Sequence, residues 1–203
     1  NDALSVSLTA IATLLAVVMT PLNLAFWGNM YEPTSAILRS VSVPPIDMVK
    51  LVGLILGIPL ILGMLIHEKY PLSAQRISNV MKKLSLLFFI TLIFLALGNN
   101  LVAFERYVME VFWLVLLHNL VAFSTGFSLA KWWRLSWKDT KTVTIETGIQ
   151  NSGLGLLLIF TFFDGLGGMA ILTAFWGIWH LISGLLLGTF FRNYPALNAK
   201  VYD

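Results

Sequence analysis

The 203-residue sequence contains no cysteine, and charged residues make up only 11% of it. Without cysteine, this stretch of chain can form neither a disulfide framework nor a thiolate metal site. It has 58% hydrophobic residues and a mean hydropathy of +0.83, whereas about 45–50% of residues in a typical soluble domain are apolar and about a quarter are charged. The composition therefore excludes an ordinary water-soluble protein and predicts one that lies in a lipid bilayer.

Six apolar stretches have the length, or nearly the length, of a membrane span, which needs about 20 helical residues to cross a core about 30 Å thick. They cover residues 3–27, 43–66, 84–99, 108–130, 143–163 and 168–191. In lipid only helices and closed barrels satisfy the backbone, and these stretches lack the apolar and polar alternation of barrel strands. The sequence thus predicts an all-α, polytopic membrane protein with a single transmembrane domain over residues 1–203.

Lysine and arginine are distributed unevenly between the two sides of this predicted bundle. Ten of them lie between spans two and three, between spans four and five, or after span six: Lys69, Arg76, Lys82, Lys83, Lys131, Arg134, Lys138, Lys141, Arg192 and Lys200. Only Arg39, Lys50 and Arg106 lie on the other side. Because cytoplasmic loops are enriched in basic residues, both chain ends are predicted to be cytoplasmic, and the positive charge is assigned to topology and anionic lipid. Residues 29–42 are then expected to form an extracytoplasmic loop, and no nucleic-acid partner is expected.

The fifth span carries polar groups where lipid-facing residues would be expected, because residues 142–155 read TVTIETGIQNSGLG. A charge at membrane depth costs at least about 2.5–3.5 kcal/mol, so Glu146 must be neutralised, hydrated or bound to a cation. Glycines on both sides of the Gln-Asn pair weaken the helix by about 1 kcal/mol each. We therefore predict a helix interrupted between about Gly148 and Gly153, with half-helix ends that can hold anions and Na⁺.

Other polar residues in the spans leave alternatives open. Ser5 and Thr9 lie one turn apart on one helical face and could provide oxygen atoms to a cation, or could hydrogen-bond to their own backbone. Glu146 could bind a cation, or could pair with Lys141 near the cytoplasmic surface. His118 and Asn119, in the fourth span, could face the core domain of the bundle or make hydrogen bonds across helices.

Three blocks of the sequence carry a resemblance to a known family. The run from Glu146 to Gly153, ETGIQNSG, resembles the signature Glu-x-Gly-x-Gln-Asn-Ser-Gly in the ninth helix of the bile acid:sodium symporter family. The opening ALSVSLT of residues 3–9 resembles the start of that family's fifth helix, and Trp179-His180 with Ser183-Gly184 resembles its tenth. The resemblance implies a ten-helix fold of two inverted five-helix repeats. This chain would hold the fifth to tenth helices, with one of the two broken crossover helices, and would lack the first four.

The same resemblance implies two sodium sites and a place for the substrate. The first site would use the side chains of Ser5, Thr9 and Glu146, and the second would use Glu146, Gln150 and the carbonyls of Thr147 and Ile149. Asn151 and His180 would line the substrate cavity. The implied substrate is an organic anion, either a bile acid or a smaller carboxylate.

We therefore expect a sodium-coupled symporter in the inner (plasma) membrane, and not an enzyme. The alternative is a non-transporting truncated membrane protein or partner subunit, because a site at a repeat interface needs both repeats and the missing helices would complete it. An intramembrane hydrolase would need Ser183 to act with His180, and no Gly-x-Ser-x-Gly elbow accompanies them.

Overall fold

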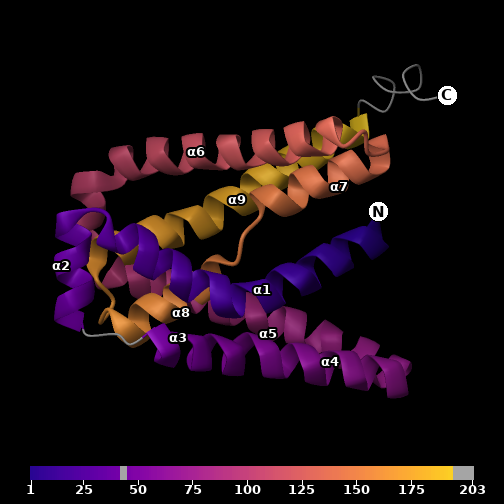
Figure 1. The fold of residues 1–203 in the computed structure, drawn as a ribbon, viewed down its shortest axis with the longest axis horizontal. Helices are drawn as coiled ribbons and strands as arrows, with labels where there is room; N and C mark the ends of the chain where they lie inside the picture. Colours follow the sequence, from indigo (N-terminus) through magenta and orange to yellow (C-terminus); the bar gives the residue numbers. More distant parts are fainter. Residues whose placement is uncertain (42–44, 194–203) are drawn as a thin grey trace. The chain divides into compact units, whose positions relative to one another are not determined.

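The computed structural model describes residues 1–41 and 45–193, and their side chains except for those of residues 39–45. The elements along the chain (Figure 1) are α1 (Asp2–Asn29), α2 (Glu32–Val41), α3 (Pro45–Val52), the π-helix η1 (Gly53–Gly57), α4 (Ile58–Lys69), α5 (Pro71–Gly98), α6 (Leu101–Trp132), α7 (Trp137–Gly148), α8 (Ser152–Phe162) and α9 (Gly167–Asn193). Within these described ranges every regular element is helical. The predicted all-α fold is therefore confirmed.

Within the described residues, six segments are long and apolar enough to cross a membrane, as the hydropathy pattern predicts. They are Asp2–Asn29, Ile46–Lys69, Pro71–Gly98, Leu101–Trp132, Trp137–Phe162 and Gly167–Asn193. The predicted start of the second span, at residue 43, lies outside the described residues. The largest difference concerns the third span, which was predicted at residues 84–99 and begins at Pro71. Proline is favoured in the first turn of a helix, and the polar residues that follow extend the helix beyond its apolar part.

Part of the predicted loop at residues 29–42 is instead the short helix α2. Glu32 and Pro33 lie in its first turn, where a negative charge and a proline are both favoured. The Thr34 hydroxyl donates to the carbonyls of Gly28 at 2.7 Å and Tyr31 at 2.8 Å. These bonds attach the start of α2 to the end of α1. The segment is therefore helical although its polar composition predicted a loop.

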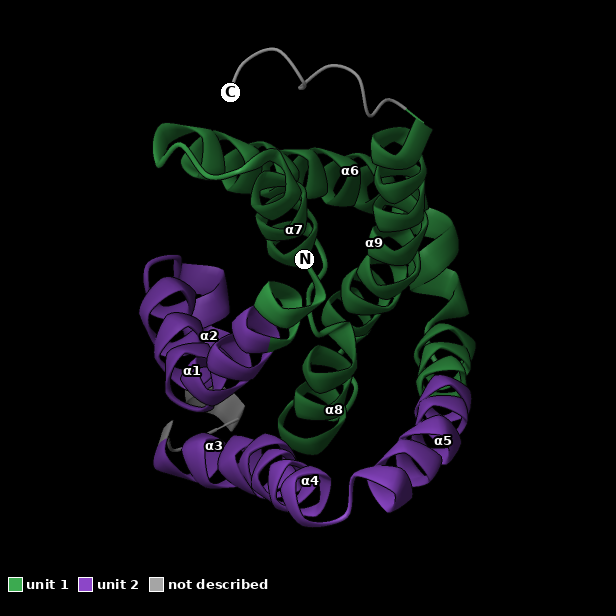
Figure 2. Ribbon diagram, turned by 90° about the vertical axis from the view of Figure 1, so that its right-hand side faces the viewer, with its two compact units in different colours: residues 1–6, 89–203 green, residues 7–88 purple. Residues whose placement is uncertain are grey.

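The chain forms two compact units (Figure 2). Unit 1 contains residues 1–6 and the chain from residue 89 onward, and unit 2 contains residues 7–88. Most fully buried apolar side chains belong to α6, α8 and α9 of unit 1, among them Val115, Leu156 and Ile171. In this unit α6 packs along α7 and α9, and α8 packs along α9. Unit 1 therefore holds the packed core around the interrupted span.

The contact between α6 and α7 depends on a glycine. A Cβ atom added to Gly126 would lie 2.7 Å from Thr147 Oγ1, 2.8 Å from Thr147 Cβ and 3.1 Å from the Val143 carbonyl oxygen. In a membrane, small residues allow helices to approach closely, and dispersion and hydrogen bonding then hold them together. Gly126 of α6 therefore permits a close approach to the C-terminal part of α7, at Val143 and Thr147.

We expect Gly126→Ala to destabilise unit 1 by about 1–3 kcal/mol, the usual cost of overpacking, because the added methyl group meets the backbone of α7. The measurement is the midpoint of thermal unfolding in detergent. Gly188→Ala is the matched control, since a Cβ atom there meets nothing within 4 Å. Equal midpoints for the two variants would contradict this account of the helix contact.

A candidate ion-binding site at a broken helix

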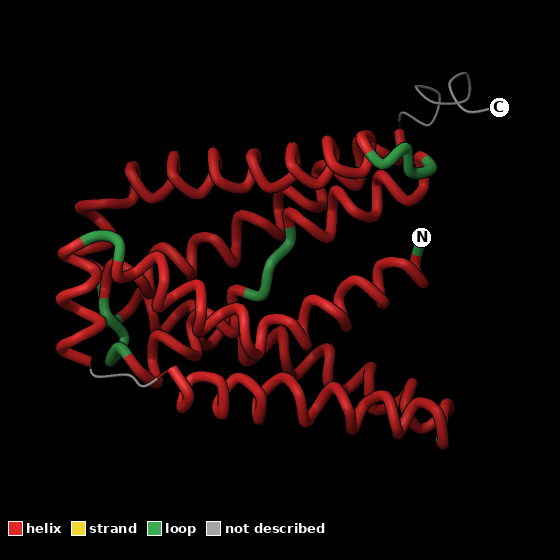
Figure 3. Tube along the Cα trace, viewed as in Figure 1, coloured by secondary structure: helices red, strands yellow, loops and turns green. Residues whose placement is uncertain are grey.

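The fifth span is interrupted in the middle, between the end of α7 at Gly148 and the start of α8 at Ser152. Figure 3 shows the interruption as a loop segment between two helices. Ile149 has an extended backbone with φ −100° and ψ 117°, and Asn151 has φ −83° and ψ 77°. The predicted break between Gly148 and Gly153 is confirmed. That this helix crosses a second broken helix stays a prediction.

Local contacts explain why one helix stops and another starts here. The ring of Phe123 occupies the place where a side chain at Gly148 would begin, so glycine is needed at the end of α7. On the other side, Asn151 Oδ1 accepts a hydrogen bond from the Leu154 backbone N–H at 3.0 Å. Asparagine is among the best N-cap residues. The amide pair that marked the break in the sequence therefore also initiates α8.

The backbone carbonyls at the break fall into two groups. Three of them accept hydrogen bonds: Ile145 from the Ile149 N–H at 3.0 Å, Gly148 from Asn119 Nδ2 at 2.8 Å, and Gln150 from the Ser152 N–H at 3.0 Å. Within residues 1–41 and 45–193, no hydrogen-bond donor reaches the carbonyl oxygens of Thr147 and Ile149. Both of these carbonyls were predicted as sodium ligands. The break thus presents two acceptors that lack a hydrogen-bond donor from the described protein.

Ser5 and Glu146 are brought together although they are 141 residues apart in the sequence. The Ser5 hydroxyl donates a hydrogen bond to Glu146 Oε1. It therefore does not bind only the backbone of its own helix, which was the alternative interpretation. Thr13, by contrast, donates to the Thr9 carbonyl at 2.7 Å. A hydroxyl and a carboxylate in contact form the beginning of an all-oxygen ligand set, which is what a hard cation requires.

For the other residues predicted in the sodium and substrate sites, the structure shows the position but does not test the role. Thr9 belongs to unit 2, and its proposed approach to Glu146 stays a prediction. Gln150 and Asn151 are exposed within the break. His180 lies in α9 and is only 4% exposed, so its role in lining a substrate cavity also stays a prediction. Lys141 was the alternative partner predicted for Glu146. Its ammonium lies 5.9 Å from the centre of the Trp137 ring.

Asn119 makes the hydrogen bond across helices that was one of its two interpretations. It is 1% exposed, donates from α6 to the last carbonyl of α7, and accepts at Oδ1 from the Ser183 hydroxyl of α9 at 2.5 Å. The only signal in the sequence was a polar residue within an apolar span. Its partners, 29 and 64 residues away, could not be identified from that signal.

The same network accounts for Ser183, the candidate nucleophile of the hydrolase alternative. Its hydroxyl donates to Asn119 Oδ1 and to the backbone carbonyl of His180, the latter at 3.2 Å. A nucleophile would instead direct its proton to a ring nitrogen of the base. The geometry therefore assigns Ser183 to helix packing.

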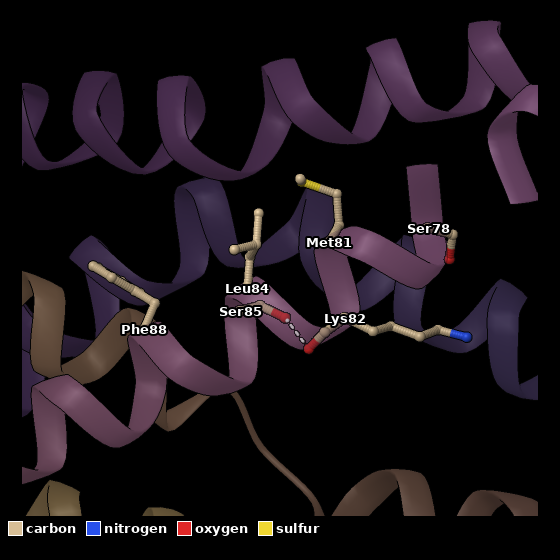
Figure 4. A pocket seen from close by; sticks show the side chains of 6 residues that line it. All are labelled: Ser78, Met81, Lys82, Leu84, Ser85 and Phe88. Atoms are coloured by element: carbon tan, nitrogen blue, oxygen red, sulfur yellow. Dashed lines mark hydrogen bonds between the residues drawn. The ribbon is translucent and has the colours of Figure 1, made fainter. Parts of the chain in front are cut away.

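A surface depression on α5 lies apart from these groups along the chain. Figure 4 shows that its lining side chains all extend from this one helix: Ser78, Met81, Lys82, Leu84, Ser85 and Phe88. The Ser85 hydroxyl in it donates to the Lys82 carbonyl of its own helix at 3.2 Å. One helix face does not enclose a ligand, because small-molecule sites bury most of the ligand surface.

A family comparison supports the assignment suggested by the broken helix. The model of the Sodium Bile acid symporter family matches residues 1–105. The chain belongs to this family. The matched residues include Ser5 and Thr9 and end before the broken span.

Pairwise comparisons extend the family relationship through the broken span. The chain is 28% identical over 193 residues to the uncharacterized sodium-dependent transporter YocS of Bacillus subtilis, which covers 95% of this chain and 57% of that protein. It is 34% identical over 156 residues to sodium/bile acid cotransporter 5 of Mus musculus, covering 77% of this chain and 35% of that one. It is 28% identical over 193 residues to the probable chloroplastic sodium/metabolite cotransporter BASS2 of Oryza sativa, covering 95% and 44%. The chain thus spans between about a third and somewhat more than half of these relatives.

Proposed function

We propose that the complete protein is a sodium-coupled symporter of organic anions that works by alternating access, and that this chain carries a large part of its sodium sites. The observation that carries the proposal is the interrupted α7–α8 span, where Glu146 contacts Ser5 and two carbonyls receive no hydrogen bond from the described residues. Interrupted helices supply ion ligands at the centre of many secondary transporters. The names of the relatives, which describe sodium-dependent transporters and cotransporters, point in the same direction.

For sodium, the oxygen atoms of the described residues fit the expected ligand sets in part. The first site would combine Ser5 and Glu146 with Thr9. The second would combine Glu146 and Gln150 with the two free carbonyls. All of these ligands are oxygen atoms, and Glu146 supplies the charge that offsets part of the cost of removing Na⁺ from water. Further ligands would come from the part of the longer relatives that this chain does not cover.

For the substrate, the cap of α8 leaves a useful group exposed. Asn151 Oδ1 accepts from the Leu154 N–H, and the other polar atom of the same amide, Nδ2, is a donor that can bind an anion. It lies at the N-terminal end of α8, where the helix dipole also favours negative charge. Both features suit an organic anion. A bile acid or a smaller carboxylate would carry the charge in either case.

We expect Glu146→Ala to abolish sodium-dependent uptake in proteoliposomes that contain the full-length protein, because both proposed sites lose their only charged ligand. Uptake of a labelled bile acid and of a labelled monocarboxylate would be compared under inward gradients of Na⁺ and K⁺. In the variant, uptake under Na⁺ should fall to the rate seen under K⁺. Glu105→Ala is the control, since this glutamate is exposed in the first turns of α6 and should retain the sodium effect. Concentrative uptake by a correctly inserted Glu146→Ala protein would exclude the mechanism, and wild-type uptake of neither anion would favour a non-transporting protein.

We expect Asn151→Asp to separate the helix cap from substrate binding. Aspartate caps a helix as well as asparagine does, so α8 should keep its cap, and any fall in the thermal midpoint should reflect the cost of the added charge at membrane depth. The variant has no amide donor and presents a negative charge, so substrate should bind about 10-fold more weakly or worse, which is the loss expected for a hydrogen bond to a charged group. Asn151→Ala should also weaken substrate binding while leaving some sodium response, and should lose about 1 kcal/mol of stability with the cap. Unchanged substrate affinity in Asn151→Asp would remove Asn151 from the substrate site.

We further propose that both ends of the chain face the cytoplasm of a plasma membrane. Because these 203 residues contain no cysteine, Lys138→Cys and Val102→Cys can each be labelled with a membrane-impermeant maleimide, with the unsubstituted protein as the blank. In intact cells Val102→Cys should react and Lys138→Cys should not, and permeabilised cells should show both. The reverse pattern would invert the topology.

A further inference from the structure

Asn119 is buried in α6, so both the oxygen and the nitrogen of its side-chain amide need hydrogen-bond partners. Its Nδ2 donates to the Gly148 carbonyl at 2.8 Å, and its Oδ1 accepts from Ser183 Oγ at 2.5 Å. With 1% of the residue exposed, an unpaired amide would cost about 1–3 kcal/mol. Hydrogen bonds through Asn119 therefore connect three helices, because Asn119 lies on α6, Gly148 on α7 and Ser183 on α9.

Along the chain, the Gly148 carbonyl lies between the carbonyls of Thr147 and Ile149, to which no described residue donates a hydrogen bond. The peptide unit that joins Gly148 to Ile149 is held at both of its polar atoms: its oxygen accepts from Asn119, and its N–H donates to the Ile145 carbonyl at 3.0 Å. The preceding peptide unit carries the Thr147 carbonyl, and the following one carries the Ile149 carbonyl. Because peptide units are planar, fixing the middle unit restricts how the two flanking carbonyls can be oriented.

This restriction matters because glycine would otherwise allow many orientations. Gly148 has no Cβ atom, so its own dihedral angles are less limited than those of other residues. On the far side of the break, the Ile149 side chain packs on α9, where a Cβ atom added to Gly184 would lie 2.7 Å from Ile149 Cδ1. The break is therefore held by α6 on its backbone and by α9 on its side chain.

We propose that Asn119 is a positioning residue of the sodium site at the broken helix. By donating to the Gly148 carbonyl it fixes the peptide unit between the other two carbonyls, and so it orients the carbonyls of Thr147 and Ile149 for the cation. Ser183 acts through Asn119, since its hydroxyl holds the amide in the orientation that directs N–H toward Gly148. The inference rests on the proposed sodium-coupled function and adds to it a residue that touches neither the ion nor the substrate.

The test measures Na⁺ binding without any organic substrate. The thermal midpoint of the purified full-length protein is recorded against Na⁺ concentration, with K⁺ replacing Na⁺ to keep the ionic strength constant. Asn119→Leu removes both hydrogen bonds at similar volume, and Asn119→Asp keeps the acceptor for Ser183 but lacks the N–H. Both should raise the half-saturating Na⁺ concentration by about 10-fold or more, as loss of a group that orients a metal ligand does.

Ser183→Ala should raise the half-saturating Na⁺ concentration by a smaller factor, on the order of threefold, the equivalent of one ordinary hydrogen bond. Added to Asn119→Leu, it should have no further effect on Na⁺ binding, because its partner is already absent. Ser124→Ala, at an exposed position of the same helix α6, is the matched control and should bind Na⁺ like the wild type. Ser183→Ala leaves every backbone partner of the break in place, so its result decides the matter if the Asn119 variants do not fold.

Two outcomes would overturn the proposal, and they differ in what else they affect. If the wild type responds to Na⁺ and K⁺ alike, the sodium site of the proposed function fails, and the role of Asn119 fails with it. If the wild type responds to Na⁺ but the Asn119 and Ser183 variants keep its half-saturating concentration, Asn119 only holds helices together. Lower midpoints in K⁺ with unchanged Na⁺ binding would show this purely structural role.

Discussion

A backbone interruption inside a bilayer leaves carbonyl and amide groups that lipid cannot satisfy, and unit 1 is organised around this constraint. The protein satisfies the interruption at α7–α8 with its own groups: Asn151 caps α8, and Asn119 reaches the last carbonyl of α7. Two carbonyls receive no donor from the described residues, and both lie one residue from Gly148. A hard cation is the natural partner for such oxygen atoms, because it needs ligands that water would otherwise provide.

Close packing by small residues makes these hydrogen bonds possible. Apolar side chains gain little from leaving lipid for a helix interface, so association depends on close contact and interhelical hydrogen bonds. Gly126 brings α6 against α7, and Gly184 makes room on α9 for Ile149. At Gly177 the ring of Phe89 and the Ser152 hydroxyl approach so closely that a Cβ atom would lie 2.5 and 2.7 Å from them. Close contacts from α6 and from α9 therefore support the short non-helical segment between α7 and α8.

In the proposed mechanism, the charge of Glu146 links this architecture to sodium binding. A carboxylate at this depth is costly, and its contact with the Ser5 hydroxyl offsets only part of that cost. A bound cation would offset much more, and it would also reduce repulsion toward an anionic substrate at the N-terminal end of α8, where the helix dipole favours negative charge. Sodium and substrate would then stabilise each other, and this coupling is reciprocal by thermodynamic necessity.

The amino-acid sequence alone determined the all-α membrane class, the six spans and the position of the break. These follow from properties of the chain itself: hydropathy over about 20 residues, the cost of Glu146 in lipid, and glycines on either side of an amide pair. Through a family resemblance it also predicts Ser5 as a sodium ligand, which stays a prediction, while the structure shows Ser5 in contact with Glu146. The helix α2 and the start of α5 at Pro71 were missed, because polar residues near span ends read as loops when only hydropathy is used. Only the tertiary structure showed that Asn119 binds the Gly148 carbonyl, that Ser183 binds Asn119, and that no described residue donates to the carbonyls of Thr147 and Ile149. Those facts depend on distances between helices that are far apart in the chain, and no local property of a sequence contains them.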